Sequence, residues 1–143
     1  MDKRMFAVFG LFLVAMIGCA YATDSADNTV TISDVNFTIP DGFTEDVSEA
    51  IVNETDSEDG TNYVTNGKTF ENGDNYLLIS VSEYEQPVTE DIIKDLGEKT
   101  TINNNVTGYF EDLGLLSLFT YIQDGKVVVV TSNDKNVIME TFN

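Results

Sequence analysis

The sequence predicts an α+β domain, in which an antiparallel sheet of about five to seven strands packs against two or three helices. Two observations support this fold class. Several short segments alternate apolar with polar residues, as half-buried strands do. Three others have apolar residues at helical spacing, and two of these three follow a candidate capping residue. Turn sequences between the segments are short, which favours hairpins of sequential strands.

The first third of the domain contains two strands and a helix in this prediction. Residues 29–32 and 35–39 alternate apolar with polar side chains, and Pro40-Asp41-Gly42 ends the second strand in a turn. Beyond it, Phe43, Val47, Ala50 and Ile51 recur at near-helical spacing. We therefore expect a short helix there.

The middle of the chain is predicted to form an acidic loop, a hairpin and a central strand. Residues 54–62 are rich in acidic, Gly, Ser and Thr residues, which indicates a loop. Asn66-Gly67 predicts a tight hairpin turn, because both residues tolerate positive φ angles. A second turn at 72–74 leads into the apolar segment 76–82.

The last third predicts two helices around a further set of strands. Thr89 is a candidate cap for a helix ending near Gly97, and residues 101–110 form an interrupted strand. The clearest hairpin joins 115–122 to 126–131. Ser132 or Asn133 then caps a final short helix.

The first 22 residues have the three parts of an export signal. Lys3 and Arg4 precede an uncharged apolar run over 5–17, which is too short to span a bilayer. Two processing patterns overlap after it. Ala20-Tyr21-Ala22 favours cleavage before Thr23, whereas residues 16–19 resemble a lipobox that would leave Cys19 lipidated. The predicted organisation is a signal peptide (1–22), a flexible leader (23–28) and one acidic domain (29–143), extracellular or at the cell surface.

The charge of the chain restricts its partners. It has 25 acidic and seven basic residues, for a formal net charge of −18. Such a surface repels nucleic acid and anionic lipid, so we expect neither as a partner. No membrane span is expected after signal removal, although Cys19 could carry a lipid tether. The expected partner is a protein or a cell-envelope component.

Composition also argues against catalysis. The chain has no histidine, and its single cysteine, Cys19, lies in the signal region. These absences remove the usual nucleophile–base pairs and most zinc or copper sites. We therefore predict a non-enzymatic binding domain without a cofactor. A hydrolase that uses a pair of carboxylates is the less favoured alternative.

Calcium binding is the other alternative, as part of an adhesion or envelope module. Calcium prefers oxygen ligands on flexible loops. The candidate ligands are Asp56, Glu58 and Asp59 in one acidic loop, with Glu71 and Asp74 in the next. Neither loop has EF-hand spacing, so a solvated acidic loop is the simpler interpretation.

Three Asn-x-Ser/Thr sequons are candidate glycosylation sites in an exported protein. Asn53 and Asn105 are the candidates, while Asn36 lies in a predicted strand and is less favoured.

Two stretches carry a resemblance to known proteins. Residues 37–43 (Phe-Thr-Ile-Pro-Asp-Gly-Phe) and the run 119–131 with its following helix are similar to small exported proteins of methanogenic archaea. The order of elements also resembles the PsbP-like α/β/α sandwich domains. The resemblance implies a fold and a compartment, and it implies no catalytic residues.

Overall fold

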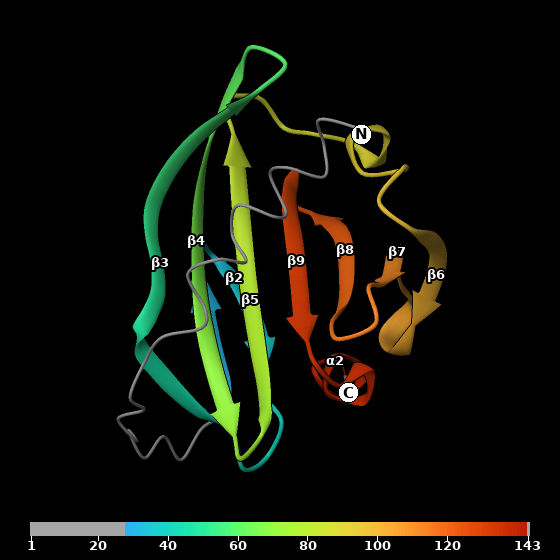
Figure 1. The fold of residues 1–143 in the computed structure, drawn as a ribbon. Helices are drawn as coiled ribbons and strands as arrows, with labels where there is room; N and C mark the ends of the chain where they lie inside the picture. The colour runs from blue at the N-terminus through green and yellow to red at the C-terminus, as the bar shows by residue number, and fades with distance from the viewer. Residues whose placement is uncertain (1–27, 143) are drawn as a thin grey trace.

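The computed structural model describes residues 28–142 and consists mainly of antiparallel strands (Figure 1). The strands are β1 (Thr29–Ile32), β2 (Val35–Thr38), β3 (Thr44–Glu58), β4 (Thr61–Asn72), β5 (Asn75–Tyr84), β6 (Glu98–Ile102), β7 (Val106–Asp112), β8 (Ser117–Gln123) and β9 (Lys126–Ser132). Strands β1 and β2 form a separate hairpin. The other seven form one sheet in the order β3-β4-β5-β9-β8-β7-β6.

Two meanders meet in the middle of this sheet. The first runs β3-β4-β5 from one edge inward, and the second runs β6-β7-β8-β9 inward from the other edge. Strands β5 and β9 pair antiparallel at the junction, with Ser80 opposite Val129. The connection formed by residues 85–97 therefore has to cross from the centre of the sheet to its far edge (Figure 1).

The predicted α+β class is wrong, because strands account for 62% of the described residues, which contain one short α-helix. The expected helix at 43–51 lies in β3 instead. The register between β3 and β4 shifts after Asp46 and again after Ile51. A bulge adds residues to one strand and breaks the alternation of its side chains, so the apolar spacing there imitates a helix.

The second expected helix is reduced to a single 3₁₀ turn, η2 (Glu90–Ile92). Thr89 precedes this turn but makes no side-chain capping hydrogen bond. The third expected helix is confirmed as α2 (Lys135–Glu140). Its cap is Asp134 rather than Ser132 or Asn133, because the Asp134 side chain accepts a hydrogen bond from the Asn136 backbone NH.

The turn expected at Asn66-Gly67 is also wrong. Gly67 lies in the middle of β4, where an added Cβ would come within 3.0 Å of the Ile79 carbonyl oxygen. The turn occurs instead at Asp59-Gly60, inside the stretch expected to be a loop. Both turn residues have positive φ angles, 50° and 81°, which a tight turn between twisted strands requires. The predicted hairpin at 115–131 is confirmed as β8 and β9.

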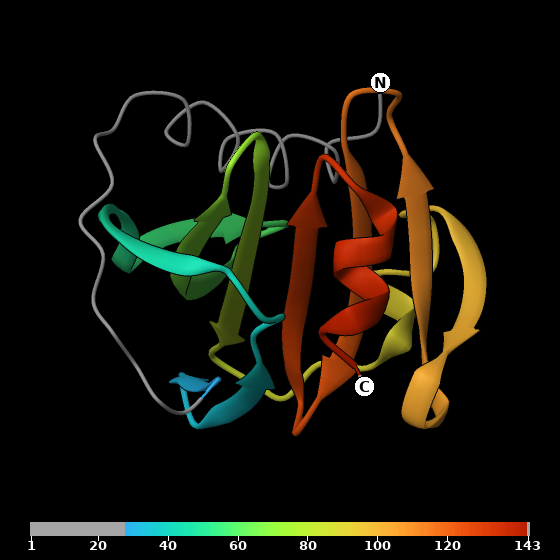
Figure 2. The same cartoon turned by 90° about the horizontal axis from the view of Figure 1, so that it is seen from below.

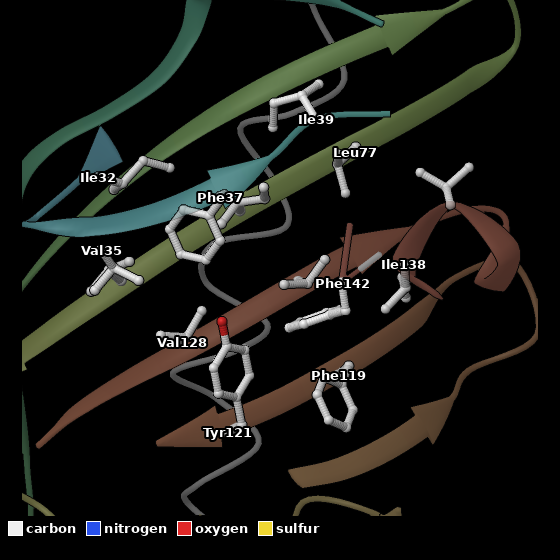
Figure 3. Packing of buried hydrophobic residues seen from close by; sticks show 14 of the residues in the cluster. Ile32, Val35, Phe37, Ile39, Leu77, Phe119, Tyr121, Val128, Ile138 and Phe142 are labelled. Carbon is white, nitrogen blue, oxygen red and sulfur yellow. The ribbon is translucent and has the colours of Figure 1, made fainter. Parts of the chain in front are cut away.

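The main core lies between one face of the sheet and a cover made by the β1–β2 hairpin and α2 (Figure 2). Val128 and Val130 of β9 point into it, and Phe142 lies edge-on to Phe119 and Tyr121 (Figure 3). Each fully buried aliphatic or aromatic side chain contributes about 1.5–3 kcal/mol. This cluster therefore fixes the hairpin and α2 on the same face.

A smaller core covers part of the opposite face. Val127 alternates with Val128 along β9, so it points the other way and packs with Tyr109 and Ile93. Ile93 belongs to the crossing connection, which is thereby held against the sheet. Helices of the described part of the chain are all too short to cross a bilayer.

Candidate functional site

The β3–β4 hairpin extends past the end of β9 and forms an acidic arm at one end of the sheet (Figure 1). A groove of about 700 Å³ lies on this arm. It is lined by three neighbouring strands: Thr55, Asp56 and Ser57 of β3, Asn62, Tyr63 and Val64 of β4, and Glu83 and Tyr84 of β5 with the following Glu85. We call this feature the arm groove.

One face of the arm carries a row of carboxylates. Glu54, Asp56 and Glu58 occupy alternate positions of β3, so their side chains leave the strand on the same side. Glu54 and Asp56 are exposed and Glu58 is half-buried. Because β3 is an edge strand of the sheet, this row is accessible along its outer side. Charged side chains on an edge also discourage pairing with other strands.

Two tyrosines lie beside the carboxylates. Tyr63 pairs with Asp56 across one strand boundary and with Tyr84 across the next. The two rings are stacked, with centroids 4.7 Å apart. The Tyr63 hydroxyl donates to Asp56 Oδ2 at 3.4 Å, and the Tyr84 hydroxyl donates to Glu58 Oε2 at 3.1 Å. The aromatic pair therefore holds two carboxylates in fixed positions.

The tyrosine hydroxyls are held in the protonated form. Burial, reinforced by the charges of Asp56 and Glu58, raises the pKa of Tyr63 to about 12. Burial and the neighbouring Glu58 raise the pKa of Tyr84 as well. A neutral phenol donates its proton and a phenolate cannot. Both hydroxyls thus remain donors to the carboxylates throughout the physiological pH range.

Cations inside the described part of the chain neutralise few of these carboxylates. Lys126 Nζ lies 2.8 Å from Glu83 Oε1 and also donates to the Ser33 carbonyl oxygen. Glu85 accepts only a neutral hydrogen bond, from the Asn62 amide. None of the ion pairs formed between residues 28–142 involves Asp56, Glu58 or Glu85. The groove consequently keeps an excess of negative charge.

The structure separates the residues expected to bind calcium. Asp56, Glu58 and Asp59 lie together at the end of the arm. Glu71 and Asp74 lie at the other end of β4, ten or so residues and about 30 Å of extended chain away. Within residues 28–142, no group of three or more His, Cys, Asp or Glu side chains is arranged to hold a metal ion.

The remaining predicted sites divide between described and undescribed residues. Asn53 is exposed at the second register shift of β3, and Asn105 is exposed in the 3₁₀ turn η3 (Asn103–Asn105). Glycosylation of both stays a prediction. Cys19 and the signal peptide lie outside the described residues.

Sequence reasoning missed Tyr63 and Tyr84 as site residues. The hairpin turn predicted at Asn66-Gly67 does not bring Tyr63 beside Asp56, and the apolar segment predicted at 76–82 stops before Tyr84. Asp59-Gly60 is an equally good turn signal. A hairpin centred there pairs Tyr63 with Asp56, which would have pointed to the groove.

Comparisons with protein-family models, curated proteins and solved structures gave no match for this chain. Any statement about function therefore rests on the geometry described above.

Proposed function

We propose that this protein is a non-enzymatic binding domain that acts outside the cytoplasm, and that its arm groove binds a lysine- or arginine-bearing segment of a partner protein. The observation that carries the proposal is the row of carboxylates, unpaired by cations within the described chain, beside a stacked tyrosine pair. The signal-like residues 1–22 support the compartment.

The chemistry of the groove matches a cationic side chain. Carboxylates attract a lysine or arginine head group, and an aromatic ring beside them adds a favourable contact with the same cation. The tyrosine hydroxyls fix Asp56 and Glu58 before the partner arrives. Such preorganisation lowers the entropy lost on binding. The overall negative charge of the chain speeds the approach of a basic partner, and this contribution weakens with salt.

The experiment separates this site from general attraction to an acidic protein. A fluorescently labelled oligolysine peptide is titrated with the full chain, and binding is followed by anisotropy. The double variant Asp56→Asn/Glu58→Gln is compared with Glu71→Gln/Asp74→Asn, which removes the same charge at the far end of β4. We expect the groove variant to weaken binding about tenfold, since two surface charge pairs are lost, and the matched variant to change it less than twofold.

A third variant tests the aromatic contribution without changing the charge. Tyr84→Leu removes the half-buried ring and the hydroxyl that donates to Glu58. It should weaken oligolysine binding by a smaller factor than the double variant. Equal affinities for the groove variant and the matched variant would mean that the peptide senses only net charge, and the proposed site would then be abandoned.

A further inference from the structure

A second feature of β3 has no part in the arm groove: it contains two buried carboxylates three residues apart. Asp46 is 0% exposed and Glu49 is 7% exposed. One oxygen of each, Asp46 Oδ2 and Glu49 Oε2, has no hydrogen-bond partner. An ionised carboxylate buried without a partner is destabilising by several kcal/mol. Buried polar atoms are nearly always satisfied, so two orphan oxygens in one segment require a physical reason.

The carboxylates lie in the first bulge of β3, where the strand bends outward from β4 (Figure 1). Asp46 pairs with Thr69 and Ile51 pairs with Gly67, so residues 47–50 of β3 face the single residue Lys68. Backbone carbonyl groups in such a bulge leave the regular ladder. The bulge therefore takes residues 47–50 out of the paired β3–β4 register, in the same segment as the two buried carboxylates.

Local hydrogen bonds hold this segment in shape. Asp46 Oδ1 accepts from the Ser48 backbone NH at 3.0 Å and from the Ser48 hydroxyl at 2.6 Å. The Thr69 hydroxyl donates to the Glu49 carbonyl oxygen at 3.1 Å. These bonds satisfy one carboxylate oxygen of Asp46 and leave Oδ2 without a partner, which is how a metal-binding carboxylate is commonly oriented by its neighbours.

Lys68, which lies next to Thr69 in β4, forms an ion pair with Glu45 and not with the buried carboxylates. Lys68 Nζ lies 3.0 Å from Glu45 Oε1. Successive residues of β4 point to opposite faces, so Lys68 leaves the strand on the side away from Thr69, the partner of Asp46. No ion pair between residues 28–142 reaches Asp46 or Glu49. The described chain thus supplies no cation for this pair.

We propose that the first β3 bulge is a calcium site, with Asp46 and Glu49 as its carboxylate ligands and bulge carbonyl oxygens and water completing the shell. Calcium accepts six to eight oxygen ligands in irregular arrangements, whereas magnesium requires a near-octahedral set. Two carboxylates are few, so the expected Kd is on the order of 10⁻⁴ to 10⁻³ M, the range of extracellular calcium modules. This site is separate from the loop residues that the acidic sequence pattern indicated.

The test measures calcium binding and thermal unfolding on the full chain after removal of metal with a chelator. Calorimetric titration with calcium chloride should give one binding event. At a calcium concentration of ten times Kd, the folded-to-unfolded ratio should rise about tenfold, with a higher Tm. Asp46→Asn and Glu49→Gln should each abolish both responses. Asp74→Asn, which removes an exposed carboxylate outside the bulge, should keep them.

A crossover in stability distinguishes a metal ligand from a residue needed only for folding. In chelator, Asp46→Asn should be more stable than the natural chain, because it removes a buried carboxylate that no cation of the described chain neutralises. In excess calcium, the order should reverse. Absence of a calcium response in the natural chain overturns the proposal. A calcium response in both bulge variants equal to that of the natural chain also overturns it. An equal response to magnesium overturns the assignment to calcium. Since Glu49→Gln gives an independent reading, failure of Asp46→Asn to fold would still leave a decisive result.

Discussion

Replacing Gly108 by alanine tests how closely the sheet packs beneath its aromatic cluster. Gly108 lies in β7, where an added Cβ would meet Phe119 Cζ at 2.8 Å and Tyr121 Cβ at 2.9 Å. The Thr120 carbonyl oxygen would be closer still. Gly108 has no positive φ angle, so conformation alone favours the substitution. Alanine in a strand interior ordinarily gains roughly 0.5–1 kcal/mol over glycine.

The steric cost should outweigh that gain. Overpacking a filled core costs about 1–3 kcal/mol, and a backbone carbonyl cannot rotate out of the way as a side chain can. We expect Gly108→Ala to lower the free energy of unfolding by about 1–3 kcal/mol. With an m value of about 1–3 kcal/mol/M in urea, the midpoint should fall by roughly 1 M at unchanged m.

Urea unfolding followed by circular dichroism measures this change. Gly73→Asn is the matched control: the residue lies in the β4–β5 turn with φ 61° and no atom within 4 Å of an added Cβ. Asparagine tolerates that conformation, so its effect should stay below about 1 kcal/mol. A Gly108→Ala variant as stable as the natural chain would refute the packing argument.

Four further outcomes are expected. Phe119→Ala should lower the free energy of unfolding in urea by about 3–5 kcal/mol, because the fully buried ring contacts Tyr121 and Phe142. Asp134→Ala should lower it by only about 1 kcal/mol, because the variant loses the N-terminal cap of α2. The free energy of unfolding should fall as the pH rises from 10 towards 12, since the pKa of Tyr63 is about 12 in the folded chain and 10 in the unfolded chain. The loss is at most about 2.7 kcal/mol. Denaturation at successive pH values measures it, and Tyr63→Phe should make the free energy of unfolding depend less steeply on pH. Tm should rise between about 0.05 and 1 M potassium chloride, because salt screens the repulsion of the acidic surface, and a flat profile would contradict that reasoning.

Elements whose signals are local were predictable from the sequence. The β8–β9 hairpin carries alternating side chains on both sides of a turn at Asp124-Gly125, and the predicted segments match the observed strands closely. The final helix was also found, since Ile138 and Phe142 are four positions apart, as residues on one helix face are, and polar residues able to cap a helix precede them. In both cases the residues that decide the structure lie within about fifteen positions of each other.

Tertiary structure decided the rest. The spacing of Val47 and Ile51 imitates a helix, and only pairing with β4 shows it to be a bulged strand. The order of strands depends on β5 meeting β9, which lie about fifty residues apart in the chain. The arm groove and the buried carboxylates of Asp46 and Glu49 follow from that pairing. A sequence pattern records which residues are apolar or charged, whereas burial and contact depend on which strands the folded sheet brings together.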